Sequence, residues 1–158
     1  CAAAPFARVS PRRGPDGEPL YLDIFVPPHE AEAYLPDQIA QIIAPRLQPK
    51  DQVICQLGVG GHVDHILVRQ AVERLNRPLW YTADVPYLFW TPEQLAPLVD
   101  GMKESLLTVT EAGLKAWIEA ILAHESQIST LFKVPEKVEE EIRAYYSEQS
   151  GLPIWNIK

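Results

Sequence analysis

The amino-acid sequence predicts an α/β fold of the Rossmann-like kind, with a largely parallel sheet flanked by helices. Two observations predict it. Short apolar runs, typical of buried strands, alternate along the chain with longer stretches whose apolar residues recur at helical spacing. The 158 residues are 47% hydrophobic and 22% charged, which is the composition of a soluble protein and enough chain for a single α/β domain spanning residues 1–158.

The first third of the chain is expected to hold a loop, a strand and a helix. Residues 1–19 are rich in proline and glycine, which is typical of a loop, and the arginines there are expected to be solvated. Residues 20–26 could form a short strand. A helix is predicted from about residue 36 to 47, because Pro36 suits a first turn and apolar residues follow on one face, with Pro45 disturbing the last turn.

The middle of the chain predicts a strand, a glycine loop, a helix and a second strand. Residues 52–57 are mostly apolar, which predicts a strand buried on both faces. The glycine loop 58–61 follows, then a helix from about Val63 to Leu75 and a strand over residues 79–82. The remaining predicted elements are a helix over 92–99, a strand over 105–109, a long amphipathic helix from Thr110 to Phe132, a final helix over 135–147 and a trailing segment over 152–157.

The composition argues against several classes of protein. The net charge of −7 argues against nucleic acid as the main partner, because phosphate binding needs a basic surface. No apolar run approaches the roughly 20 residues of a membrane span, so a cytoplasmic location is expected. The two cysteines suggest neither a disulfide framework nor a cysteine zinc site, and Cys55 is expected to be buried. A lipoprotein tether through Cys1 is the alternative location.

The turn after the first strand of this middle region is the part of the chain best suited to chemistry. In open α/β sheets, ligands bind beyond the carboxyl ends of the strands, where residues 58–65 would lie. His62 and His65 are three positions apart and can share one helix face. The positive end of the helix disfavours protonated imidazole, and neutral imidazole is the form that binds metals. Asp64 is close enough to orient a histidine.

Other interpretations of this turn remain open. A catalytic zinc usually has about three protein ligands, and the turn offers at most two. His62, Asp64 and His65 could simply be helix-start residues with satisfied hydrogen bonds. Residues 58–61 could instead cradle a phosphate or a nucleotide, although Val63 replaces the third glycine of G-x-G-x-x-G and no P-loop lysine follows.

Three stretches of the sequence resemble the PIG-L/LmbE deacetylases, which are zinc-dependent enzymes that remove acetyl groups from N-acetylglucosamine conjugates and related amides. Together the stretches cover roughly residues 50–130. The matching stretches are Leu57-Gly58-Val59-Gly60-Gly61-His62-Val63-Asp64-His65, then Leu79-Trp80-Tyr81-Thr82-Ala83-Asp84-Val85-Pro86-Tyr87, and finally Lys115-Ala116-Trp117 with Ala123-His124-Glu125-Ser126-Gln127.

The resemblance implies a role for each matching residue. His65 would be a zinc ligand, and His62 would stabilise the developing oxyanion and protonate the leaving amine. Asp64 would be the carboxylate that tunes its neighbours, and Asp84 would lie at the rim of the pocket. Three further residues would line the substrate pocket, although they could equally serve helix packing and loop capping: Lys115, His124 and Gln127.

The sequence also departs from this family. The family's His-Pro-Asp-Asp motif supplies two more zinc ligands and the general base, but it is absent here, and His29 does not match it. The sequence therefore resembles the C-terminal part of such an enzyme, and we expect it to lack the first strands of that fold. We expect an incomplete zinc site, an inactive chain when it is isolated, and an amino-sugar conjugate as substrate of the longer enzyme. The alternative is a non-catalytic α/β binding domain.

Aromatic residues are frequent shortly after the second strand of this middle region. Aromatic rings can stack on sugar rings, but they also pack ordinary protein cores, and the sequence leaves both interpretations open. The residues are Trp80, Tyr81, Tyr87, Phe89 and Trp90.

Overall fold

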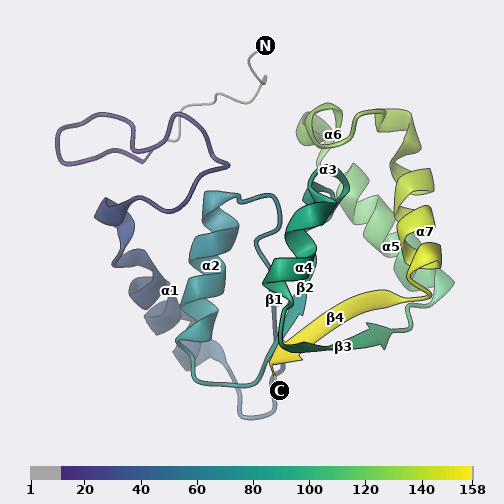
Figure 1. Ribbon diagram of the computed structural model, residues 1–158, viewed down its shortest axis with the longest axis horizontal. Coiled ribbons are helices and arrows are strands. Elements are labelled where there is room, and N and C mark those ends of the chain that lie inside the picture. Colours follow the sequence, from purple (N-terminus) through teal and green to yellow (C-terminus); the bar gives the residue numbers. More distant parts are fainter. Residues whose placement is uncertain (1–11, 158) are drawn as a thin grey trace. The chain divides into compact units, whose positions relative to one another are not determined.

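The computed structural model describes residues 12–157 and has the predicted α/β architecture, a four-stranded sheet with helices (Figure 1). The strand order is β1-β2-β4-β3. Contacts divide the chain into two compact units. The first runs to Lys103 and includes the chain from Trp155 onward, and the second is Glu104–Ile154. The two units are described separately below.

The parallel part of the sheet is formed by β1 (Val53–Gln56) and β2 (Leu79–Thr82). Val53 lies opposite Leu79, and Gln56 lies opposite Thr82. Helix α2 (Val63–Glu73) connects the two strands and contacts β1. This strand–helix–strand unit confirms the prediction made from the middle of the chain, and it brings the carboxyl ends of both strands to the same edge.

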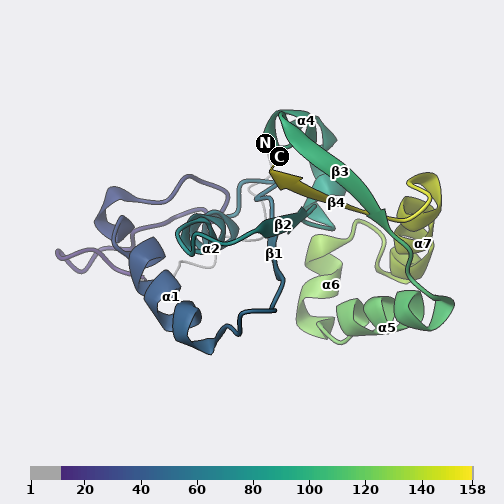
Figure 2. The same ribbon diagram turned by 90° about the horizontal axis from the view of Figure 1, so that it is seen from below.

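Two more strands complete the sheet, and each of them crosses the boundary between the units. They are β3 (Met102–Leu107) and β4 (Leu152–Ile157). Figures 1 and 2 show these neighbouring strands running in opposite directions. The trailing segment expected over residues 152–157 is therefore a strand. The sequence of this segment alone did not predict it, because its neighbours in the sheet, β2 and β3, lie far away in the sequence.

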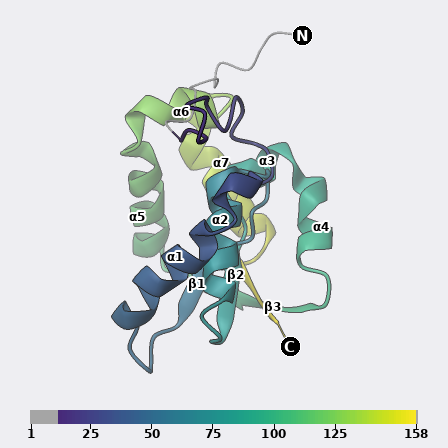
Figure 3. The ribbon, with the colours of Figure 1, turned by 90° about the vertical axis from the view of Figure 1, so that its left-hand side faces the viewer.

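Helix α1 (Leu35–Ile43) packs beside α2, as Figures 1 and 3 show. Pro36 lies in its first turn, and a 3-10 turn over Ala44–Arg46 takes over at Pro45, so both proline predictions are confirmed. The hydrophobic core at this place is formed by residues from α1, α2 and the preceding loop, namely Leu20, Tyr21, Val26, Leu35, Val63 and Leu67.

Short helical segments make up the rest of the first unit. They are a 3-10 turn at Glu30–Glu32, α3 (Tyr87–Trp90), a 3-10 turn at Pro92–Gln94 and α4 (Leu95–Leu98). The last two correspond to the helix predicted over residues 92–99, which is present as a 3-10 turn followed by one short α-helix.

The second unit is helical apart from its parts of β3 and β4. Its helices are α5 (Glu111–Leu122), α6 (Glu125–Leu131) and α7 (Val138–Glu148), with a 3-10 turn at Pro135–Lys137 before α7. The Thr110 hydroxyl accepts a hydrogen bond from the Gly113 amide and so caps α5. Helix α5 contacts both α6 and α7.

Three sequence predictions of secondary structure were wrong in detail. Residues 20–26 form no strand, because an Asp23 side chain that accepts from the Phe25 amide makes a local turn there. The helix predicted from Thr110 to Phe132 is split, because His124 has ψ 49° and leaves the helical conformation. Strand β1 is buried on one face only, with exposed and buried residues alternating along it.

Candidate functional site

The glycine loop between β1 and α2 has a backbone that only glycine adopts readily. The φ angles of Gly58, Gly60 and Gly61 are 85°, 86° and 75°. A Cβ atom on Gly60 would also lie 2.7 Å from the Cβ of Tyr87. The loop lies at the carboxyl edge of the parallel strands, as predicted, and α3 closes against it through Tyr87.

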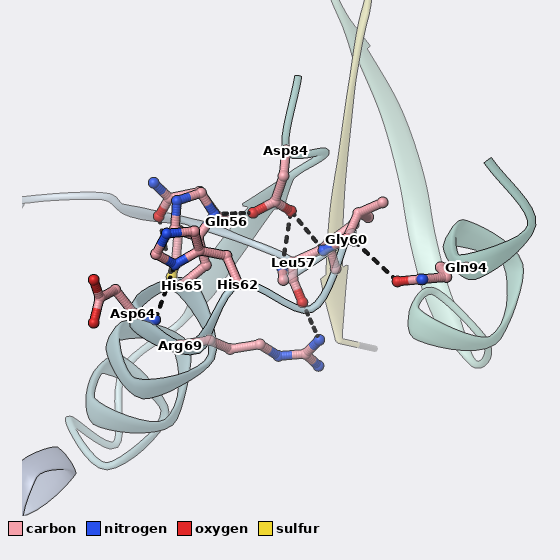
Figure 4. A network of polar contacts seen from close by, with 12 residues as sticks. Gln56, Leu57, Gly60, His62, Asp64, His65, Arg69, Asp84 and Gln94 are labelled. Carbon is pink, nitrogen blue, oxygen red and sulfur yellow. Dashed lines mark hydrogen bonds and ion pairs between the residues drawn. The ribbon is translucent and has the colours of Figure 1, made fainter. Parts of the chain in front are cut away.

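Asp84, which follows β2, is the central side chain of this site (Figure 4). Its Oδ2 atom accepts hydrogen bonds from the amides of Gly58 and Val59 at 2.8 and 2.9 Å. Its Oδ1 atom lies 2.6 Å from Nδ1 of His65. Asp84 is 3% exposed, so the expectation that it lies at the rim of a pocket is corrected: the buried carboxylate binds the loop and a histidine. A role for Asp84 in substrate binding stays a prediction.

Two more side chains hold the loop from other elements. The Arg69 guanidinium, on α2, donates to the carbonyl of Leu57 at 2.7 Å. The Gln94 side chain, from the 3-10 turn before α4, accepts from the Gly60 amide at 2.9 Å. Figure 4 shows both contacts. The conformation of the loop is thus set by residues from three separate segments.

These contacts bear on the phosphate interpretation of the loop. A phosphate cradle needs free backbone amides that point at the ligand. Here the amides of residues 58 and 59 donate to Asp84, the amide of residue 60 donates to Gln94, and the Gly61 amide donates to the loop's own carbonyl. A buried carboxylate beside the loop would also repel an anion. The loop in this conformation is not a phosphate-binding loop.

His65 is held in the orientation typical of a metal-binding histidine. Because an ionised carboxylate only accepts hydrogen bonds, the contact with Asp84 places the ring proton on Nδ1. The Nε2 atom is then left with its lone pair. Histidine ligands of metals commonly donate their other nitrogen to a carboxylate in this way, which fixes the tautomer and raises the basicity of the ligand. The side chain is 26% exposed.

His62 has the opposite hydrogen-bond pattern. It caps the N-terminus of α2, with Nδ1 accepting from the Asp64 amide at 3.1 Å. The neutral ring therefore carries its proton on Nε2. Burial lowers the pKa of His62, the neighbouring His65 and Arg12 lower it further, and the Asp64 carboxylate opposes them. The His62 ring centroid is 4.9 Å from that of His65. Two adjacent rings therefore offer a donor, the Nε2–H of His62, and an acceptor, the Nε2 lone pair of His65.

The Asp64 carboxylate does not bind either histidine. It pairs with the Arg12 guanidinium at 2.8 Å and is 57% exposed, so its influence on His62 is through charge alone. Arg12 also pairs with the buried carboxylate of Glu32 at 3.2 Å. Arg12 was expected to be solvated, and no local pattern in the sequence distinguishes it from Arg13, which is exposed.

Aromatic rings surround the histidine pair on one side. Tyr87 stacks on His62, with centroids 6.1 Å apart and an interplanar angle of 28°. Phe25, from the loop before α1, contacts the rings of His62 and Tyr87 edge-on, with centroids 5.7 and 5.5 Å apart. The ring centroid of Trp90 lies 6.4 Å from that of Phe25. The sequence singled out Tyr87 and Trp90 but not Phe25, which lies far from them in the chain.

Other aromatic residues of that group lie elsewhere. Tyr81 is fully buried in β2, with its hydroxyl donating to Glu73. Trp80 lines a cavity of about 620 Å³ at the amino end of β2 and the C-terminal end of α2. No histidine is among the residues that line this cavity. The carboxylate that lines it, Glu73, is also paired with Arg69 at 2.9 Å. The cavity is therefore separate from the histidine site.

The three residues that the resemblance placed in the substrate pocket lie in the second unit. Lys115 is exposed on α5, with its ammonium group 3.7 Å from Glu119. His124 and Gln127 are exposed at the start of α6, where the Gln127 amide donates to the carbonyl of His124. A role for these residues in substrate binding stays a prediction.

The described residues fit one position of a metal site rather than a complete one. His65 offers a nitrogen of suitable chemistry, and His62 uses one of its own nitrogens to cap α2. Within residues 12–157, no three side chains of histidine, cysteine, aspartate or glutamate are grouped so that they could hold a metal ion.

In the same part of the chain, no helix has the length and apolar character needed to cross a membrane.

Comparisons with known proteins identify the fold. No family model and no curated protein matches the chain. Among solved structures, the zinc-inhibited form of the teicoplanin deacetylase Orf2 is similar, with a TM-score of 0.71 and 17% identity. This chain has a deacetylase-like fold. The match covers 92% of this chain but 62% of the solved chain, so the present sequence spans under two thirds of that protein's length.

Proposed function

We propose that this chain carries part of the active site of a metal-dependent amide hydrolase, which removes the acetyl group from an N-acetylated amino-sugar conjugate. The observation that carries the proposal is the contact between His65 and Asp84, which leaves the His65 Nε2 lone pair available beside the Nε2–H of His62. The deacetylase-like fold supports the same chemistry at the level of the fold alone.

His65 would hold the metal ion through Nε2, with Asp84 behind it. A bound zinc ion supplies Lewis acidity and lowers the pKa of its water. Because no three metal-binding side chains are grouped within residues 12–157, further ligands would have to come from outside these residues.

His62 would stabilise the negative charge that develops on the acetamide oxygen. Its capping contact with the Asp64 amide leaves Nε2–H as a donor, and the lowered pKa keeps the ring neutral at neutral pH. Oxyanion donors of this kind typically contribute about 3–4 kcal/mol to the transition state. Arg12 supports this state of the ring, because its charge opposes protonation of His62.

The aromatic wall would form the apolar side of the substrate site. Phe25, Tyr87 and Trp90 are each partly exposed, so their rings can still contact a ligand. Their position beside His62 suits a substrate whose sugar ring packs on an aromatic face while its amide reaches the histidines.

The test uses the complete gene product and its His65→Ala variant. We expect the wild-type protein to hold zinc and to release acetate from an N-acetylglucosamine derivative, with both properties lost or strongly reduced in the variant. Lys137→Ala, which alters an exposed residue with no predicted role in the site, separates loss of the ligand from a general effect of substitution. Unchanged zinc content in His65→Ala would show that the ligand assignment is wrong.

A non-catalytic binding domain is the competing function. The lack of a three-donor group among the described residues is compatible with it. It predicts that N-acetylated amino sugars bind, in calorimetry or in NMR titrations of the Trp90 indole, while no acetate is released at any zinc concentration. Release of acetate that depends on His62 would exclude it.

A further inference from the structure

The Asp84 carboxylate performs two tasks with its two oxygen atoms. Oδ2 accepts from the amides of Gly58 and Val59, and Oδ1 accepts from the Nδ1–H of His65 (Figure 4). The side chain has no exposed surface, so water cannot replace any of these partners. Three donors therefore depend on a single buried group.

Only a carboxylate meets all three demands. An asparagine of nearly the same shape has one acceptor oxygen and one donor NH₂ group. If its oxygen faced the loop, the NH₂ group would face His65, whose Nδ1 would then have to accept and whose proton would move to Nε2. If its oxygen faced His65, the NH₂ group would oppose the amides of Gly58 and Val59.

We propose that Asp84 is a positioning residue that couples the tautomer of His65 to the conformation of the glycine loop. The loop can keep its conformation, and His65 can keep its free Nε2 lone pair, only while both oxygens of Asp84 act as acceptors. The coupling rests on hydrogen bonds within the chain. The proposed function enters only in the use that a metal ion would make of Nε2.

Gln94 provides the comparison that isolates this coupling. It also holds the loop, through the Gly60 amide, but it comes from a different segment and has no contact with His65. Loosening the loop through Gln94 should therefore leave the tautomer of His65 unchanged. Loosening it through Asp84 should not.

The experiment compares the wild-type chain with Asp84→Asn and Gln94→Ala. Long-range ¹H–¹⁵N NMR of the imidazole rings reports the tautomer at a fixed pH where His65 is neutral, and amide hydrogen exchange reports the loop. We expect Nδ1–H in the wild type and in Gln94→Ala. In Asp84→Asn the two backbone amides should retain the single oxygen, because two bonds outweigh one, and Nε2–H should become the major tautomer.

The alternative result for Asp84→Asn, in which Nδ1–H is retained and the amides of residues 58 and 59 exchange about tenfold faster or more, also supports the coupling. A folded Asn variant that keeps both the Nδ1–H tautomer and the protected amides would overturn it. So would an Nε2–H tautomer in the wild-type protein.

Asp84→Glu keeps the proposal testable if the Asn variant does not fold. It preserves two acceptor oxygens on a longer side chain, so the Nδ1–H tautomer and the protected amides should both be present. A folded Glu variant with protected amides and an Nε2–H ring would overturn the coupling. None of these measurements involves a metal, so failure of zinc binding or of acetate release would count against the proposed function alone.

Discussion

A Cβ atom added to Gly60 would lie 2.7 Å from the Cβ of Tyr87, and the φ angle of Gly60 is 86°. Space and backbone conformation therefore both require glycine at this position, two residues before His62. Gly61 has a similar φ of 75° but nothing within 4 Å of the corresponding Cβ position. The two neighbouring glycines separate the effect of crowding from the effect of backbone strain.

Gly60→Ala is predicted to be more destabilising than Gly61→Ala. The left-handed conformation should cost about 1–2 kcal/mol at both positions, and the collision with Tyr87 should add about 1–3 kcal/mol at Gly60 alone. Urea denaturation of both variants measures the difference in the free energy of unfolding. Equal losses of stability would show that Tyr87 moves freely and that α3 does not close tightly on the loop.

Arg12→Ala is predicted to reduce stability by about 1–3 kcal/mol, because it removes the cation from the buried carboxylate of Glu32. Arg13→Ala is the matched control, since Arg13 is exposed and binds the carbonyl of Gly17. Thermal denaturation under identical conditions compares them. A loss in the control as large as in Arg12→Ala would contradict a specific role for the Arg12 ion pairs.

The same Arg12→Ala variant is predicted to raise the pKa of His62. The guanidinium lowers that pKa in the folded protein, so its removal should allow the ring to bind a proton at higher pH. NMR titration of the His62 ring protons measures the shift. A pKa that stays unchanged or falls would show that Arg12 does not act on the ring.

The folded protein is predicted to lose stability as the pH falls from neutral toward 5. The pKa of His62 is lowered on folding from its ordinary value near 6.5, so below that value the unfolded chain binds a proton that the folded ring does not. His62→Asn keeps a capping oxygen for α2 but cannot titrate. Its free energy of unfolding should therefore decline less over this range, and an equally steep decline would assign the effect to other groups.

Cys55 is predicted to be a slow nucleophile. Burial raises the pKa of its thiol to about 11, with the Asp84 carboxylate acting in the same direction. In a Cys1→Ser background, reaction with iodoacetamide should be slow at pH 8 and should accelerate as the pH approaches 11. Denatured protein at pH 8, where the thiol is solvated, should react quickly. Equally rapid labelling of the folded protein at pH 8 would show that Cys55 is accessible and ionised.

Local patterns in the sequence were sufficient to predict the framework of the site. The order of strand, glycine loop, helix and strand over residues 53–82 follows from apolar periodicity and glycine placement, both of which are local properties. The position of His62 as the N-cap of α2 and of His65 one turn later follows from the same helix boundary.

Contacts between distant segments were not predictable in the same way. Arg12 and Phe25 come from a loop whose sequence shows no periodicity, yet one pairs with Asp64 and the other packs on His62. Asp84 was recognised, but its burial was not. The position of Asp84 just after the second strand could have indicated its contact with the glycine loop. Parallel strands bring their carboxyl ends to one edge of the sheet, so residues that follow two such strands lie close together.

The sequence by itself determined which residues are available for chemistry and on which elements they lie, since helix and strand periodicity are properties of neighbouring residues. The tertiary structure decided what those residues can do. Whether Asp84 contacts solvent or His65, and whether the loop amides are free or bonded, depends on packing between segments that are 19 to 34 residues apart. That packing sets the His65 tautomer through Asp84, whereas the His62 tautomer is set locally by the capping contact with the Asp64 amide. The two rings therefore have opposite tautomers, because each ring's proton position depends on the partner of its Nδ1 atom.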